Sequence, residues 1–228
     1  MPVRPSNCWA FFEALMIEDN WDLITGDPAH SIEVLNYSNQ VNVIEALVLF
    51  MMHHHASEDG TCTRPPLAGT LNEFHRTATL LLLSKPGHFR EEEVVVSTAN
   101  GTVVHQPPEA VAVGEHLEKF FEGLSAKWPN ETAQELAGYA LWMINWIHPF
   151  KNGNGRTARA FSYAVLSLKL GFILPGEKTV IDLIMDNRDD YQNALKVADN
   201  AFEANGEPDL APVTEFIDRL LAEQFSTF

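Results

Sequence analysis

The sequence predicts a mainly α-helical protein with one β-hairpin. Most of its 228 residues lie in segments whose apolar side chains recur at helical spacing. One stretch, residues 94–104, departs from this pattern because two β-branched runs flank an Asn-Gly pair, a strong hairpin signal. A hydrophobic fraction of 46%, without an internal repeat, then favours a single core.

The N-terminal part predicts an extension followed by a helix. Residues 9–24 have mixed helical character and end at a Gly-Asp-Pro turn, which places a helical extension over residues 1–29 and the main domain over residues 30–228. Ser38 is a good N-cap for the next helix. One face of that helix carries the apolar residues Val41, Ile44, Val48 and Met51. After a loop, residues 71–83 predict a further helix.

The rest of the chain predicts the hairpin and then further helices. The expected strands consist of Val94, Val95 and Val96, and of Thr102, Val103 and Val104. Helices are expected over residues 111–124, 131–147, 182–201 and 212–225, and from Arg156 to a C-terminal Gly171. The helix over 131–147 becomes almost wholly apolar toward its end, so we expect it at the centre of the molecule.

The charge balance limits the partners of the surface. Lys and Arg total 15 against 31 Asp and Glu, a net charge of −16 that argues against nucleic acid and anionic membranes. No apolar run reaches the ~18 residues of a membrane span, and no secretory signal is evident at the start. Two cysteines, Cys8 and Cys62, favour free thiols in a reducing compartment, so a cytoplasmic location is expected.

A polar loop between the two most apolar helices is the candidate site. It reads His-Pro-Phe-Lys-Asn-Gly-Asn-Gly-Arg-Thr-Ala-Arg over residues 148–159. Pro149 disfavours a helical His148 and should end the preceding helix there. The glycines allow a sharp turn, and the helix that follows offers free N–H groups and its positive dipole end. Two arginines at i, i+3 on its first turn suit a polyphosphate. The negative net charge does not exclude such a ligand, because a few cations and backbone N–H groups at one site can bind it.

This loop resembles the signature of the Fic family, His-x-Phe-x-(Asp/Glu)-Gly-Asn-Gly-Arg-x-x-Arg. The identical positions are His148, Phe150, Gly153, Asn154, Gly155, Arg156 and Arg159. The resemblance extends over residues 73–90, Pro107-Pro108 and residues 187–195, and so covers roughly residues 30–225. It implies a Fic-like helical bundle in which the hairpin is a flap that clamps a target protein segment by strand addition.

The resemblance also implies a reaction, the transfer of AMP from ATP to a Ser, Thr or Tyr hydroxyl of a target protein. His148 would be the general base, since an imidazole titrates near working pH. Phe150 would point into the core and fix the loop. The nucleotide would be held by Gly153, Asn154 and Gly155 at its α-phosphate and by Arg156 and Arg159 at its outer phosphates.

One position of the signature differs, because Asn152 stands where the family has a carboxylate that holds Mg²⁺. Mg²⁺ prefers anionic oxygen, so an amide is a weak metal ligand. Three interpretations remain open. Metal binding is weakened while transfer persists, the donor is another phosphate-containing molecule, or the protein is a regulatory module that binds nucleotide without efficient catalysis. Phosphoryl transfer, as in the related Doc toxins, is a weaker alternative because those proteins lack the glycine found here as Gly155.

A possible control element lies near the N-terminus. Many members of the family carry an inhibitory helix, Ser/Thr-x-x-x-Glu-Gly/Asn, whose glutamate pairs with the second arginine of the signature. Residues 31–47 resemble this helix, which makes Glu33 the inhibitory candidate and Arg159 its expected partner. The match is degenerate, with Ala29 and Val34 at two defining positions. The alternative is an ordinary glutamate on a solvated helix face.

Overall fold

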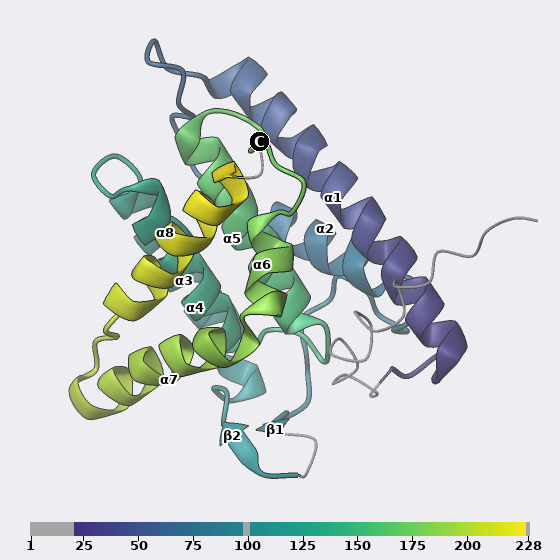
Figure 1. Cartoon of the computed structure of the whole chain (residues 1–228). Helices are drawn as coiled ribbons and strands as arrows, with labels where there is room; N and C mark the ends of the chain where they lie inside the picture. Colours follow the sequence, from purple (N-terminus) through teal and green to yellow (C-terminus); the bar gives the residue numbers. More distant parts are fainter. Residues whose placement is uncertain (1–20, 98–100, 227–228) are drawn as a thin grey trace, which may run out of the picture.

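The structure, a computed structural model, describes residues 21–97 and 101–226 (Figure 1). Its regular structure is helical apart from one small hairpin, which confirms the predicted fold class. In chain order the elements are α1 (Asp27–His55), α2 (Ala68–Thr79), β1 (Val96–Ser97), β2 (Val103–His105), the 3-10 helix η2 (Ala110–Ala112), α3 (Val113–Lys127), α4 (Ala133–Ile147), α5 (Asn154–Leu170), α6 (Val180–Asp186), α7 (Arg188–Asn205) and α8 (Ala211–Ser226). Within the described ranges, no helix is both long enough and apolar enough to cross a membrane.

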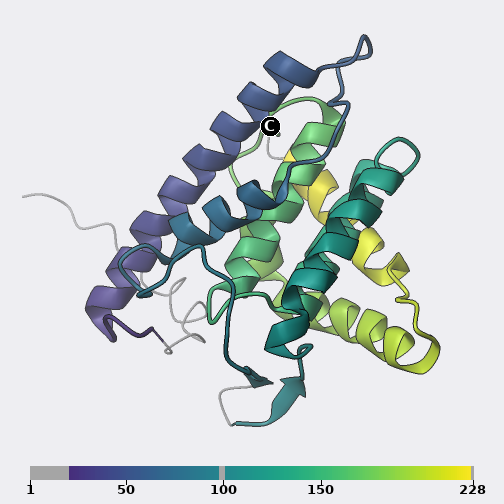
Figure 2. The same ribbon diagram turned by 180° about the vertical axis from the view of Figure 1, so that it is seen from behind.

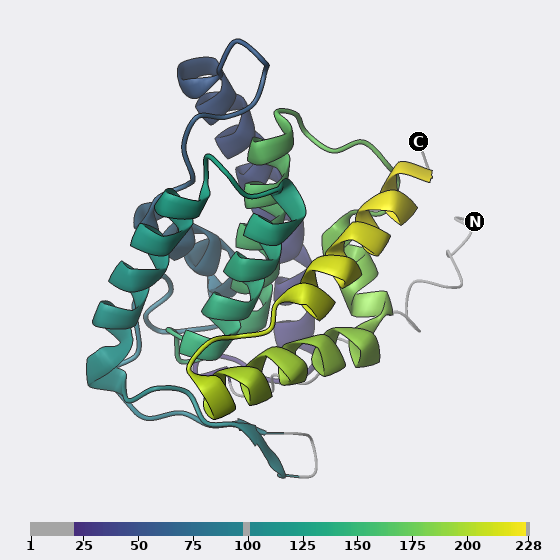
Figure 3. The ribbon, with the colours of Figure 1, turned by 90° about the vertical axis from the view of Figure 1, so that its left-hand side faces the viewer.

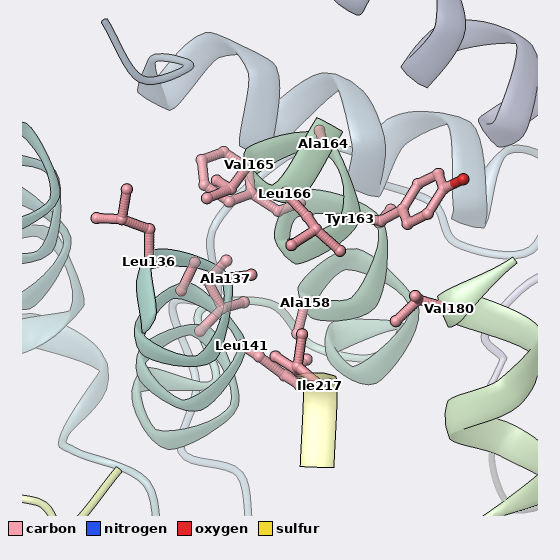
Figure 4. Close-up of a cluster of buried hydrophobic side chains, with 14 of the residues drawn as sticks. Leu136, Ala137, Leu141, Ala158, Tyr163, Ala164, Val165, Leu166, Val180 and Ile217 are labelled. Carbon is pink, nitrogen blue, oxygen red and sulfur yellow. The ribbon is translucent and has the colours of Figure 1, made fainter. Parts of the chain in front are cut away.

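Helices α4 and α5 form the centre of the bundle and pack on each other (Figure 3). Each carries fully buried alanines, such as Ala137 on α4 and Ala158 on α5, and small side chains let helices approach closely. Figure 4 shows that α6 and α8 add Val180 and Ile217 to the same cluster. The prediction that the apolar end of residues 131–147 lies at the centre is therefore confirmed. The segment 182–201, predicted as one helix, is instead divided between α6 and α7 at Asn187.

Helix α1 runs along one side of the bundle, where it contacts both α2 and α5 (Figure 2). Its inner face combines apolar side chains with two buried amides, Asn36 and Gln40. Asn36 donates to the carbonyl of Leu80 at 2.8 Å, and Gln40 donates to the carbonyl of Phe74 at 2.9 Å. The first bond satisfies a carbonyl just beyond the end of α2, and the second adds a donor to a carbonyl inside that helix, so both join α1 to α2.

The start of α1 corrects the prediction for the N-terminal part. The helix begins at Asp27, with Gly26 as its N-cap and a proline in its first turn, whereas Ser38 lies inside the helix and its hydroxyl donates to the carbonyl of Val34. A proline needs no N–H partner there, so the earlier start is compatible with continuous helix. The expected helical extension over 1–29 lies outside the described residues up to position 20, and residues 21–26 form no helix.

The hairpin is shorter than predicted and shifted along the chain. Val96 lies opposite His105 and Ser97 opposite Val103, with an irregularity between them, so Val94, Val95 and Thr102 are outside the strands. A β-branched run has no mark of register, and the bulge moves the pairing by one residue. His105 anchors the base of the hairpin, because its Nε2 lies 2.8 Å from the carbonyl of Trp146 in α4. In Figures 1 to 3 the hairpin extends beyond the ends of the helices.

Candidate functional site

The loop between α4 and α5 begins at a histidine in an unusual conformation. Helix α4 ends at Ile147 as predicted, and His148 is its C-cap with φ 49° and ψ 58°, in the left-handed region. Such a conformation is uncommon for a residue with a Cβ, and the surrounding contacts must hold it. The backbone thereby turns abruptly at His148 and places the imidazole at the end of the central helix.

The imidazole of His148 is oriented by the helix that precedes it. Its Nδ1 lies 3.2 Å from the carbonyl oxygen of Asn145. A carbonyl can only accept, so Nδ1 carries the proton and Nε2 keeps its lone pair in the neutral ring. Asn145 is itself fixed, because its amide donates to the hydroxyl of Tyr191 at 2.9 Å. In this tautomer the lone pair of the ring lies on Nε2.

Arg90 holds the backbone around His148 in place. Its side chain is 0% exposed, and its Nε donates to the carbonyl of His148 at 2.8 Å. The same guanidinium reaches the carbonyls of Pro108 and Glu92, and the Arg90 N–H donates to the carbonyl of Pro149 at 2.9 Å. Burial lowers the pKa of Arg90, with Glu93 at 3.7 Å acting in the opposite direction. The left-handed cap is thus tied to both ends of the hairpin segment.

The floor of the loop is an aromatic stack. The rings of His75 and Phe150 lie parallel, with centroids 3.7 Å apart, and Phe150 is fully buried. His75 Nδ1 accepts from the N–H of Gly87 at 2.8 Å, so its Nε2 must carry the proton that it shares with the carbonyl of Asn152 at 2.9 Å. The expectation that Phe150 points into the core is confirmed, whereas the sequence carried no sign of its partner His75.

The side chain of Asn154 closes the loop by bonding to the backbone of Phe150. Its side-chain oxygen accepts from the N–H of Phe150 at 2.9 Å, and its amide donates to the carbonyl of Phe150 at 2.8 Å. Both ends of the buried amide are therefore engaged with one backbone unit across the turn. Asn154 closes the loop through its side chain, and only its backbone N–H remains at the helix end.

Gly153 starts α5 and leaves the N–H groups of the first turn outside the helix. The first hydrogen bond within α5 runs from the N–H of Thr157 to the carbonyl of Gly153 at 3.1 Å. The N–H groups of Asn154, Gly155 and Arg156 therefore precede the helical ladder and face the loop. Together with the dipole of a 17-residue helix, these N–H groups give the start of α5 a partial positive charge.

Replacing Gly153 by alanine is expected to lower the free energy of unfolding by about 2 kcal/mol. The residue has φ +76°, and an added Cβ would lie 2.6 Å from Cγ2 of Thr79. Urea unfolding followed by circular dichroism measures the loss. Thr79→Ser removes the obstructing methyl and should restore part of the stability in the double variant. A Gly153→Ala protein as stable as the parent would contradict this account.

The two arginines of the signature lie in different surroundings. Arg156 is 11% exposed, pairs with Glu33 at 3.0 Å, and has its guanidinium 5.0 Å from the ring centroid of Trp21. Arg159 is more deeply buried and lies beside the hydroxyl of Tyr191. Burial raises the pKa of Tyr191, and Arg159 acts in the opposite direction.

Glu33 reaches this site, but its ion pair is with Arg156 and not with the expected Arg159. The side chain of Glu33 is 12% exposed, which corrects the alternative of a solvated glutamate. Its carboxylate also accepts from Nε1 of Trp21 at 2.5 Å and lies 3.7 Å from Nδ1 of His30. Arg156 and Arg159 are three positions apart on α5. The part of α1 that carries Glu33 passes α5 beside Arg156.

Asn152 has the most unusual surroundings in the loop. It is 7% exposed, and its Oδ1 accepts from the N–H of Gly153 at 2.6 Å. Its Nδ2 is buried without a hydrogen-bond partner among the described residues. The amide oxygen that would ligate Mg²⁺ is therefore occupied by a donor, and the described part of the chain holds no cluster of three metal-ligating side chains. These residues do not fit the Mg²⁺ that the resemblance implies.

Known proteins are similar to this helix–loop–helix unit. The model of the Fic/DOC family matches residues 67–166, from the start of α2 through most of α5. This part of the chain is therefore similar to the Fic/DOC family. A curated relative, the protein adenylyltransferase Fic of Nematostella vectensis, is 28% identical over 134 residues, which are 58% of this chain and 27% of the relative. The chain thus matches about a quarter of the length of that relative.

Solved structures share the fold over most of the chain. A Fic family protein from Desulfovibrio desulfuricans G20 is 24% identical with a TM-score of 0.65, and the match covers 89% of this chain and 54% of that one. A Fic domain containing signaling protein from Bacteroides thetaiotaomicron is 20% identical with a TM-score of 0.63, over 95% and 76% of the two chains. Fic-1 from C. elegans is 20% identical with a TM-score of 0.60, over 95% and 56%.

Proposed function

We propose that this domain transfers AMP from ATP to a hydroxyl group of a target protein. The observation that carries the proposal is the placement of His148, whose Nε2 is left as the basic nitrogen, within a few residues of the exposed N–H groups that begin α5. A base for a hydroxyl and a site for phosphate oxygens are the two parts that nucleotidyl transfer requires. The adenylyltransferase relative supports the same reaction.

In the proposed reaction, Nε2 of His148 takes the proton of a Ser, Thr or Tyr hydroxyl. The freed oxygen attacks the α-phosphorus of ATP, a new P–O bond forms, and the bond to the β-phosphate breaks to release pyrophosphate. The N–H groups of Gly155 and its neighbours stabilise the charge on the α-phosphate, since preorganised donors strengthen as charge develops. Arg156 and Arg159 hold the outer phosphates.

The target segment is proposed to dock on the hairpin. Val95, Val103 and Val104 are each more than half exposed. In the part of the chain that the structure describes, the sheet has two strands, so each strand there has one edge without a strand partner. An extended peptide can add to such an edge through main-chain hydrogen bonds. His105 contacts the carbonyl of Trp146 in α4, two residues before His148, which keeps the docking edge close to the proposed base.

Glu33, near the start of α1, is proposed to inhibit the binding of ATP. Glu33 occupies the guanidinium of Arg156 and competes with the phosphates that the same group would bind. A phosphate of ATP can bind Arg156 only after the carboxylate of Glu33 has moved away. The resting protein therefore binds ATP weakly, and the release of Glu33 activates it.

The test is label transfer from ATP. The Glu33→Gln protein is incubated with α-labelled or γ-labelled ATP, with and without Mg²⁺, and protein-bound label is measured. We expect label from the α position alone, and its loss by at least about 100-fold in Glu33→Gln with His148→Ala. Label from the γ position would show phosphoryl transfer instead. Saturable ATP binding without label on this chain or on added lysate proteins would favour the regulatory module, which Asn152 supports.

A further inference from the structure

The side chain of Asn152 leaves a buried amide group without a partner. Its Nδ2 has no hydrogen-bond partner among the described residues, although the residue is only 7% exposed. Leaving a buried donor unsatisfied is unfavourable, and native structures rarely tolerate it without a reason. This NH₂ group therefore indicates that a bound molecule supplies the missing acceptor.

The orientation of this amide is fixed by its neighbour. The N–H of Gly153 points at one atom of the Asn152 amide at 2.6 Å, and a donor must face an acceptor. That atom is therefore Oδ1, and the NH₂ group is the one left over. The backbone is held as well, since the carbonyl of Asn152 lies 2.9 Å from Nε2 of the buried His75. The NH₂ group thus belongs to the residue immediately before the N-cap of α5, close in sequence to the N–H groups that precede the helical ladder.

A donor in this position has a definite ligand chemistry. An NH₂ group cannot coordinate a cation, whereas it can donate to an anionic oxygen. The adjoining helix end and Arg156 also favour negative charge, and Glu33 contacts this arginine at 3.0 Å. A carboxylate at position 152 would repel phosphate unless a metal ion lay between them, and Asn152 removes that repulsion.

We propose that Asn152 donates through Nδ2 to a phosphate oxygen of the nucleotide, so that this domain binds its phosphate-bearing donor without a divalent cation. The proposal rests on the proposed function in that it concerns the same site. This role of Asn152 differs from a mere weakening of Mg²⁺ binding, because the amide itself takes the place of the cation as a partner of the phosphates. Arg156, Arg159 and the start of α5 supply the positive charge.

The test measures ATP binding by calorimetry to the full chain carrying Glu33→Gln, once with EDTA and once with excess Mg²⁺. We expect binding in EDTA to be at least as tight as in Mg²⁺. Adding Asn152→Asp should weaken binding in EDTA about 10-fold or more and restore it with Mg²⁺, because a carboxylate needs the cation. Asn152→Ala should weaken binding several-fold under both conditions. Asn130→Asp, an exposed change of the same charge at the other end of α4, should have no such effect.

Two results would overturn the role of Asn152 alone, and a third would overturn it together with the proposed function. Binding to the parent site only when Mg²⁺ is present, or equal binding by Asn152→Ala, would overturn the role of Nδ2 alone. Failure of ATP to bind under any condition would overturn the proposed function and this inference together.

Discussion

Replacing Glu33 by glutamine is expected to raise ATP affinity and label transfer by about 10- to 100-fold, the range of a coupling free energy of about 1–3 kcal/mol. The reason is the ion pair of Glu33 with Arg156, in which both side chains are nearly buried, at 12% and 11% exposure. A pair shielded from water attracts more strongly than one on the surface, so ATP must overcome a substantial competitor. Glutamine removes the charge and keeps an oxygen that can accept from Trp21.

Matched variants show whether the effect belongs to this contact. Glu45→Gln changes an exposed glutamate on the same helix and should leave ATP affinity unchanged. Trp21→Phe removes the indole N–H that donates to Glu33 and should release the glutamate in part. Equal ATP affinity in the parent and Glu33→Gln would contradict an inhibitory role for Glu33.

Replacing Arg90 by methionine is expected to lower the free energy of unfolding by about 3 kcal/mol and to reduce label transfer. The variant leaves the carbonyls of His148, Pro108 and Glu92 without the buried donor that joins them. The left-handed backbone of His148 then loses its support, so the imidazole is no longer held in one orientation.

Urea unfolding and label transfer measure the two consequences separately. Arg76→Met is the matched control, because Arg76 is half exposed and contacts Glu73, and such surface pairs contribute little. We expect its unfolding free energy within about 1 kcal/mol of the parent. Arg90→Lys keeps the charge but not the planar fork of donors, and should recover only part of the stability. An unchanged unfolding midpoint in Arg90→Met would refute the role of Arg90.

The central helices and the site loop could be predicted because their signals are local. A helix that is apolar on all sides must be buried, and Pro149 and Gly153 mark the end of one helix and the start of the next. The Ser38 cap was predicted wrongly because a good capping residue is also tolerated inside a helix when its hydroxyl bonds to the preceding turn. The hairpin existed as predicted, but its register depends on pairing that composition does not specify.

The missed features all depend on contacts between distant segments. Arg90 and His75 lie outside the loop that they support, and nothing in their immediate sequence indicates a buried partner. The choice of Arg156 over Arg159 as partner of Glu33 depends on where α1 crosses α5, which a spacing of three residues cannot reveal. The unsatisfied amide of Asn152 likewise becomes visible only once its neighbours are placed.

Helix α1 has a consequence for how inhibition could be relieved. Glu33 lies less than two turns from the start of a 29-residue helix whose continuation donates from Asn36 and Gln40 to carbonyls of α2. Moving the whole helix would expose those carbonyls and open the core, so a deletion of α1 should unfold the domain and not activate it. The inhibition by Glu33 must therefore be relieved by unwinding of the first turns of α1 alone. An activating partner would need to bind only the short segment around Trp21.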